Sequence, residues 1–384
     1  SVSLIEHAQV KRVPSLQTND FSEVLYFAHH VKFPLLIGGV SHHKKNKSAV
    51  VFDVPALKRY IDENELEQIN ISKFISGRKY EVTAISDGHN VTIPGIIEHF
   101  EQSGSHASDS IAVFPAQNLS AEQIRILRDA TVSIVSTLKI RGPLNLNFLI
   151  HGNQIFCLQI KTYFGHNVAF LSKALNRDIT QIATLTLLGQ DLTTFDLPND
   201  VWPSNDLIHV KMPVYSLLNY HSENTFDSKM KTAGSVLGRD TELSRALYKG
   251  YEASGLQIPS FGTVFISVKD TDKKAAIKLA RRFHRLGFKL IATEGTANIL
   301  AEAGLTTGIV AKIQTGNNSL LDKIFQHRVK LIINITNLSD IANRDAIVIK
   351  DYALNTHIPV FASIQSANFI LEVLESLSLT TQPI

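Results

Sequence analysis

The chain has 384 residues, enough for two or three domains, and its 44% hydrophobic and 19% charged residues are typical of a globular protein. The net charge of +3 is too small to indicate a nucleic-acid partner. No apolar run approaches the roughly 20 residues of a membrane-spanning helix, and residues 1–15 lack the apolar core of a signal peptide, so we expect no membrane partner.

The N-terminal half predicts helices and the strands of a mixed sheet. Apolar residues recur at helical spacing over residues 21–31, and residues 41–48 form a polar, basic loop. Residues 70–100 alternate in polarity like strands. A long amphipathic helix that begins with a capping-box pattern is predicted over residues 119–138. The other predicted elements are strands at 32–38 and 49–52 and helices at 55–64 and 170–190.

A hairpin is predicted at residues 144–161, and its second strand leads into the run FCLQIKTYFGH at residues 156–166. A hairpin that delivers a short polar run often builds an active site, yet this run contains no carboxylate. The single cysteine, Cys157, lies between apolar neighbours, which predicts a buried structural thiol. One cysteine allows no disulfide within the chain and fits a reducing, cytosolic compartment.

The pattern weakens over residues 190–256, and residues 256–262 are expected to form a linker. Strand-like runs then alternate with helical patterns, which predicts a parallel, doubly wound sheet that binds ligands at the carboxyl ends of its strands. Residues 293–296 follow a strand and open a helix, a place where amides and hydroxyls hold anions. The predicted elements here are strands at 262–268 and 288–293 and helices at 272–286 and 297–303.

Several long segments, in the right order, resemble the carboxy-terminal portion of the large chain of carbamoyl phosphate synthase. They include GIIEHFEQSGSHASDS (95–110), RGPLNLNF (141–148), FLSKA (170–174), MKTAGSVLG (230–238) and much of 262–305. The resemblance begins late in the family's pattern. It implies an α/β protein with a truncated ATP-grasp domain of the α+β type at 1–190, a connecting segment packed on it at 191–257, and a doubly wound, methylglyoxal-synthase-like regulatory domain at 258–384. ATP and Mg²⁺ follow as cofactors from the resemblance alone.

The family's metal and phosphate positions are changed in this chain. Where the family has L-E-V-N-P-R, Gln159, Lys161 and Tyr163 replace a glutamate, an asparagine and an arginine, and Asn147 replaces a metal-binding glutamine. Residues 37–46 lack the arginines and paired glycines of the family's phosphate loop. At about 4 Å and an effective dielectric near 20, like charges repel by roughly 4 kcal/mol per unit charge product. We therefore expect these degenerate positions to be neither catalytic nor suited to Mg-ATP, with Asn147 and Gln159 the remaining metal-ligand candidates.

Other positions match the family. The candidates for nucleotide contacts are Glu81, His106 and Asn147, and those for a remnant activator pocket are Glu101 and Asp109. The third activator position is Met212, so activator binding is not expected. Glu98 and His99 also match, and they either anchor a ligand or satisfy hydrogen bonds within the fold.

The regulatory domain keeps more of its family pattern. The resemblance implies an effector-phosphate site at Lys273, Thr293, Thr296, Lys312, Asn334 and Thr336. The expected ligand is a nucleoside monophosphate or a similar phosphorylated effector. The alternative is a helix cap at Thr296 with lysines that face solvent.

Three functional hypotheses follow from these positions. The first is a diverged, cytoplasmic carbamoyl phosphate synthase piece, in arginine and pyrimidine biosynthesis, with an impaired ATP-grasp site and an effector-binding domain. The second is a working ATP-dependent ligase that phosphorylates carbamate with support from a partner synthetase chain. The third is a non-catalytic module that forms a homodimer or docks on a synthetase chain.

Overall fold

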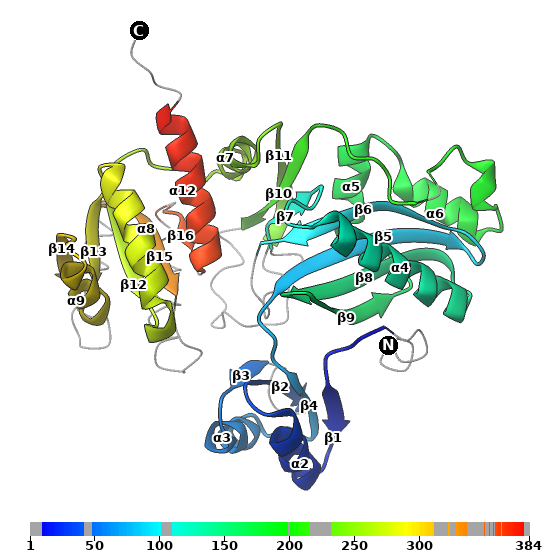
Figure 1. Ribbon diagram of the computed structural model, residues 1–384, viewed down its shortest axis with the longest axis horizontal. Coiled ribbons are helices and arrows are strands. Elements are labelled where there is room, and N and C mark those ends of the chain that lie inside the picture. Colours follow the sequence, from blue (N-terminus) through cyan, green and yellow to red (C-terminus); the bar gives the residue numbers. More distant parts are fainter. Residues whose placement is uncertain are drawn as a thin grey trace. The chain divides into compact units, whose positions relative to one another are not determined.

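The computed structural model describes residues 10–41, 48–100, 110–198, 200–215, 232–310, 328–335, 358–361 and 363–379, together with residues 322, 349, 353 and 356. The chain divides into two compact units. The described residues up to Lys211 belong to the first unit, and those from Met212 on belong to the second. Figure 1 shows the elements of both units.

A small antiparallel sheet with two helices begins the first unit, and its strand order is β1-β4-β2-β3. Its elements are β1 (Ser15–Thr18), α2 (Phe21–Val31), β2 (Leu35–Val40), β3 (Ala49–Val51), α3 (Val54–Asn64) and β4 (Gln68–Lys73). Each helix starts at an aspartate, Asp20 or Asp53, whose side chain accepts an amide hydrogen bond from the first turn. β2 begins later than expected because α2 ends at Lys32, which has a positive φ of 62°.

The main sheet has the strand order β11-β10-β7-β6-β5-β8-β9. Its strands are β5 (Arg78–Asp87), β6 (Val91–His99), β7 (Ala112–Phe114), β8 (Arg141–His151), β9 (Gln154–Lys161), β10 (Ile208–Tyr215) and β11 (Thr232–Asp240). The helices that follow or separate these strands are α4 (Ala121–Leu138), α5 (Val168–Leu175), α6 (Ile179–Leu187) and α7 (Leu243–Ala253). The central strands β6, β5, β8 and β9 pair antiparallel, as the alternating pattern and the hairpin predicted.

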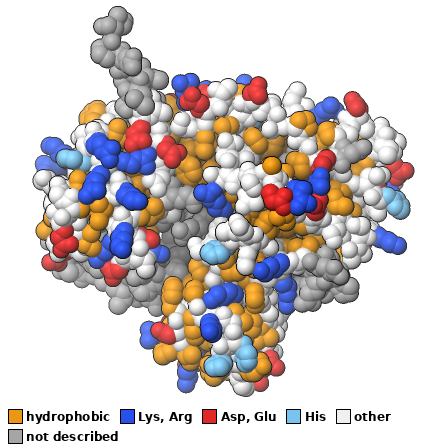
Figure 2. All heavy atoms as spheres, viewed as in Figure 1, with side chains coloured by type: hydrophobic (Ala, Val, Ile, Leu, Met, Phe, Trp, Pro, Cys, Tyr) orange, Lys and Arg blue, Asp and Glu red, His pale blue; other side chains and the backbone are white. Residues whose placement is uncertain are grey.

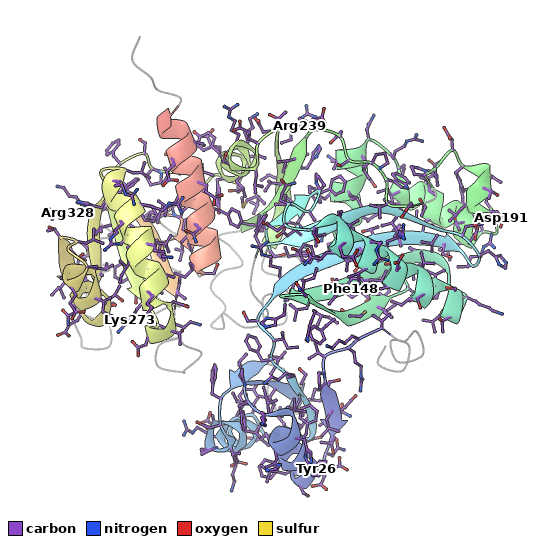
Figure 3. The ribbon with its side chains drawn as sticks, in the orientation of Figure 1. Tyr26, Phe148, Asp191, Arg239, Lys273 and Arg328 are labelled. Atoms are coloured by element: carbon purple, nitrogen blue, oxygen red, sulfur yellow. The ribbon has the colours of Figure 1, made fainter. Side chains whose placement is uncertain are left out.

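Helix α4 covers one face of the main sheet. Its capping box is formed as predicted, because Gln123 N donates to Ser120 Oγ and Ser120 N donates to Gln123 Oε1. Its apolar side packs on strand residues that include Phe148, labelled in Figure 3. Cys157 lies in the same cluster with 1% of its surface exposed, and burial raises the pKa of its thiol to about 12. The prediction of a buried thiol is confirmed.

Helices α5 and α6 pack on apolar residues of the opposite face. The helical structure predicted over residues 170–190 is confirmed, and two turn residues divide it into two helices. Asn176 ends α5 in the left-handed conformation with φ of 53°, and Asp178 caps α6 by accepting a hydrogen bond from Gln181 N. Beyond these helices, the same face carries the polar side chains of the first candidate site.

Two strands and a helix lie where the sequence pattern was weakest. β10 reads IHVKMPVY, and its polar residues His209 and Lys211 are 3% and 5% exposed. The alternation of Ile208, Val210 and Met212 with His209 and Lys211 is typical of a strand, so the sequence does carry a signal for β10. Because both faces of this strand are buried, its polar residues need partners within the fold.

The second unit contains a five-stranded parallel sheet of order β14-β13-β12-β15-β16. Its elements are β12 (Thr263–Val268), α8 (Lys273–Arg285), β13 (Lys289–Thr293), α9 (Glu294–Glu302), β14 (Thr307–Val310), β15 (Val329–Ile335), β16 (Val360–Phe361) and α12 (Ile364–Leu379). The predicted doubly wound sheet is confirmed. The strand order reverses at β12, and open parallel sheets commonly bind ligands beyond the carboxyl ends of their strands at such a reversal. Among the described helices, none has the length and apolarity to cross a bilayer.

Candidate functional sites

A bulge in the β8–β9 hairpin decides which side chains share the open face of the main sheet. Phe148 pairs with Cys157 while Asn147 pairs with Gln159, so Leu158 is the extra residue. Because of this shift, Gln159 lies on the face opposite to Cys157. Simple alternation along the strand would have put both residues on the α4 side.

The structure brings the predicted metal positions together. Asn147 and Gln159 are cross-strand partners, and Lys161 is the partner of Asn145, so these four residues share one face. Asn147 and Lys161 are half-buried, Gln159 is exposed, and Asn145 is 2% exposed. Tyr163 is 59% exposed, and the Lys161 ammonium lies 5.9 Å from the centroid of its ring. The open part of this face therefore presents amides and an ammonium.

Glu81 lies on the same face and is 4% exposed. Its Oε1 accepts a hydrogen bond from Asn145 Nδ2 at 2.7 Å, and its Oε2 accepts one from Asn167 Nδ2 at 2.9 Å. The His99 Nε2 atom lies 3.3 Å from Oε2, and Lys211 Nζ donates to Asn167 Oδ1 at 2.6 Å. We call these five residues the Glu81 network.

The Glu81 network is satisfied from within the first unit. Burial opposes ionisation of Glu81, but the hydrogen bonds from His99, Asn145 and Asn167 outweigh it and lower the pKa of the carboxyl. His99 Nδ1 lies 2.8 Å from Ser110 Oγ, so its other ring nitrogen is also engaged. No pattern in the sequence singles out Asn145, Asn167 or Lys211. Only their pairing across β8, α5 and β10 reveals them.

Gly165 lies directly over this network. A Cβ atom at Gly165 would be 3.3 Å from Asn145 Nδ2 and 3.8 Å from Glu81 Oε1. The loop that follows β9 therefore approaches the carboxylate closely and encloses it.

Glu98 points to the other side of β6 and has a different role. It is 0% exposed and accepts hydrogen bonds from Gln117 N at 2.9 Å, Asn118 N at 3.0 Å and Asn118 Nδ2 at 2.9 Å. The sequence left open whether Glu98 and His99 anchor a ligand or satisfy hydrogen bonds within the fold, and these contacts favour the second interpretation. Glu98 and His99 use different hydrogen-bond partners.

Several predicted site residues lie outside the described part of the chain. They are Glu101, His106 and Asp109 of the nucleotide and activator positions, and Lys312 and Thr336 of the effector positions. Among the described residues, no group of three or more His, Cys, Asp or Glu side chains is placed to hold a metal ion.

The second candidate site lies at the reversal point of the parallel sheet. Lys273 begins α8, as labelled in Figure 3, and its Nζ atom would lie 3.8 Å from a Cβ atom built on Gly295. Lys273 Nζ also pairs with Asp270 Oδ1 at 2.6 Å, but the Asp270 side chain is 86% exposed. The first turn of α9 and the Lys273 ammonium are therefore neighbours.

Threonine hydroxyls complete this second site. Thr293 Oγ1 lies 3.4 Å from both Ser267 Oγ and Thr296 Oγ1, and Thr296 Oγ1 accepts from Val268 N at 3.4 Å. Asn334, 7% exposed, is the cross-strand partner of Ser267. Thr293 is the N-cap residue of α9 and Thr296 lies inside the first turn, so a helix cap at Thr296 is wrong.

Two family descriptions match the chain. Carbamoyl-phosphate synthase L chain, ATP binding domain, matches residues 1–194, and MGS-like domain matches residues 275–362. An ATP-grasp domain followed by a methylglyoxal-synthase-like domain is thus the class of protein that the fold defines. The chain belongs to the carbamoyl-phosphate synthase large-chain family and corresponds to the carboxy-terminal portion of that chain.

Solved structures of other enzymes match the chain at low identity. The biotin carboxylase domain of a single-chain bacterial carboxylase is 15% identical with a TM-score of 0.50, over 65% of this chain and 61% of that chain. N5-carboxyaminoimidazole synthetase from Staphylococcus aureus is also 15% identical, with a TM-score of 0.49 over 66% of this chain and 69% of that chain. At such identities, the first likeness supports the fold alone.

Proposed function

We propose that the chain is a diverged carbamoyl-phosphate synthase piece that does not carry out Mg²⁺-dependent phosphoryl transfer and whose C-terminal domain binds a phosphorylated effector. One observation carries the first half of this proposal. The open face at β8 and β9 offers Asn147, Gln159 and Lys161, two amides and an ammonium.

Mg²⁺ does not fit this set of side chains. It prefers carboxylate oxygens and usually also binds the phosphates of its nucleotide. The carboxylate of this face, Glu81, is 4% exposed and both of its oxygens already accept hydrogen bonds. A divalent ion about 4 Å from the Lys161 ammonium is repelled by roughly 8 kcal/mol at an effective dielectric near 20.

The second half rests on the site at Lys273. A helix N-terminus with neighbouring hydroxyls favours an anion, and a lysine that reaches the same turn adds a full positive charge. Helix α8 reads KKAAIKLARRFHR, with cationic and no acidic residues, and Figure 2 shows Lys and Arg side chains gathered on this side of the second unit. This field attracts a phosphorylated ligand toward the start of α8. Such a ligand would displace the exposed Asp270 carboxylate from Lys273.

Calorimetric titration with inorganic phosphate and a panel of nucleoside monophosphates tests the effector site. We expect at least one monophosphate to bind, and Lys273→Ala to weaken it about tenfold or more, because a charge-assisted hydrogen bond contributes roughly 1.5–3 kcal/mol. Thr296→Val, which removes a hydroxyl at nearly constant volume, is expected to act in the same direction. Lys274→Ala is the matched control, because Lys274 is the exposed neighbour in the same helix. Equal affinity in Lys273→Ala and Lys274→Ala, or no binding by the unaltered chain, would refute effector binding at this site.

A further inference from the structure

The open face of β8 and β9 has an excess of positive charge. Lys161 is a half-buried residue, and no described carboxylate lies within ion-pair distance of its ammonium. Glu81, the buried carboxylate nearest along the sheet, is committed to Asn145, Asn167 and His99. A cation that has no described counter-ion on its face of the sheet favours the binding of an anion.

The neighbours of Lys161 are suited to the same kind of ligand. Asn147 and Gln159 are cross-strand partners on the face of Lys161, and each carries an amide that donates two hydrogen bonds. Asn147 Nδ2 uses one of these on Asn145 Oδ1, at 3.3 Å. The remaining N–H groups and the ammonium form a set of donors, which matches the oxygens of a phosphate group.

We propose that this face binds the phosphate groups of a nucleotide directly, without a divalent cation, with the Lys161 ammonium in place of the metal. The amides of Gln159 and Asn147 donate to the same phosphate oxygens. This inference rests on the proposed function, because it takes the first unit to be a nucleotide-binding domain that has lost its metal. Lys161 thus has a role in binding the nucleotide phosphates, whereas its charge would only repel a metal ion.

Calorimetry with ATP in EDTA, and again with excess Mg²⁺, tests the proposal on the full chain. We expect ATP to bind in EDTA at least as tightly as with Mg²⁺, because Mg²⁺ neutralises the phosphates that Lys161 attracts. Lys161→Gln is expected to weaken binding in EDTA about tenfold. Lys173→Gln on α5 removes the same charge from an exposed lysine of the first unit and is expected to change the affinity less than about twofold. Thermal unfolding of both variants confirms that each is folded.

The outcomes separate this inference from the proposed function. Binding only in the presence of Mg²⁺, no binding in EDTA, or equal affinity in Lys161→Gln and Lys173→Gln would each overturn metal-free binding. A parallel titration with pyrophosphate is expected to show the same dependence on Lys161. Turnover of Mg-ATP by the unaltered chain would instead refute the proposed function. This turnover is measured in a separate assay.

Discussion

The double variant Gln159→Glu/Lys161→Asn is expected to bind ATP roughly 100-fold more tightly with Mg²⁺ than in EDTA, whereas the unaltered chain shows no such gain. The change supplies a carboxylate beside Asn147 and removes the ammonium from the same face. Removing a repulsion of roughly 8 kcal/mol leaves ample free energy for a 100-fold change, which corresponds to about 3 kcal/mol. Calorimetry at matched ionic strength measures both affinities.

A matched control carries the same charge change away from this face. Gln154→Glu/Lys139→Asn alters two exposed residues, and Lys139 ends α4 in the left-handed conformation that asparagine tolerates well. We expect this control to keep the affinities of the unaltered chain. If the double variant on β9 behaves like the control, the electrostatic explanation of the degenerate site is wrong.

The variant Glu81→Gln is expected to lower the free energy of unfolding by about 3 kcal/mol. Its amide nitrogen would meet donors from Asn145, Asn167 or His99, and the buried Lys211 would lose the nearby negative charge. Chemical denaturation with an unchanged m-value measures the loss. Glu122→Gln is the control, because its ion pair with Arg125 is exposed and such pairs contribute little to stability. Equal stability of the two variants would mean that the Glu81 network does not stabilise the fold.

The same network gives stability a pH dependence with a defined sign. The pKa of Glu81 is lower in the folded chain than in the unfolded chain, so the unfolded state binds the proton more readily. The contribution of Glu81 is therefore fully present above its unfolded pKa and is lost as the pH falls through its folded pKa. Glu81→Gln should remove this part of the acid dependence.

Local signals in the sequence were sufficient for most of the fold. The capping box of α4, the alternation of β5 and β6, and the strand–helix alternation after residue 262 are each set by neighbours along the chain, and all three are confirmed. β10 was not predicted although its residues alternate in polarity, and the buried Lys211 has its partner, Asn167, in a distant segment. Sequence spacing alone does not reveal a polar residue that is satisfied by tertiary contacts.

The sequence was sufficient to identify residues of the candidate sites, but not to predict how these residues are arranged in space. The family resemblance located Gln159 and Lys161, yet only the bulge at Leu158 puts them on the face of Asn147. Glu81 was a candidate for nucleotide contact, whereas the structure encloses it among Asn145, Asn167 and His99. The enclosure depends on α5 and the loop at Gly165, which lie more than 80 residues along the chain from Glu81.

A crystal structure of the chain grown with ATP and MnCl₂ tests the central claim most directly, because anomalous scattering locates Mn²⁺ without ambiguity. Mn²⁺ accepts the same oxygen ligands as Mg²⁺. We predict no anomalous peak at the side-chain oxygens of Asn147 and Gln159, and phosphate oxygens in contact with the Lys161 ammonium. A Mn²⁺ ion bound to those two oxygens, with the Lys161 side chain turned away, would contradict the account.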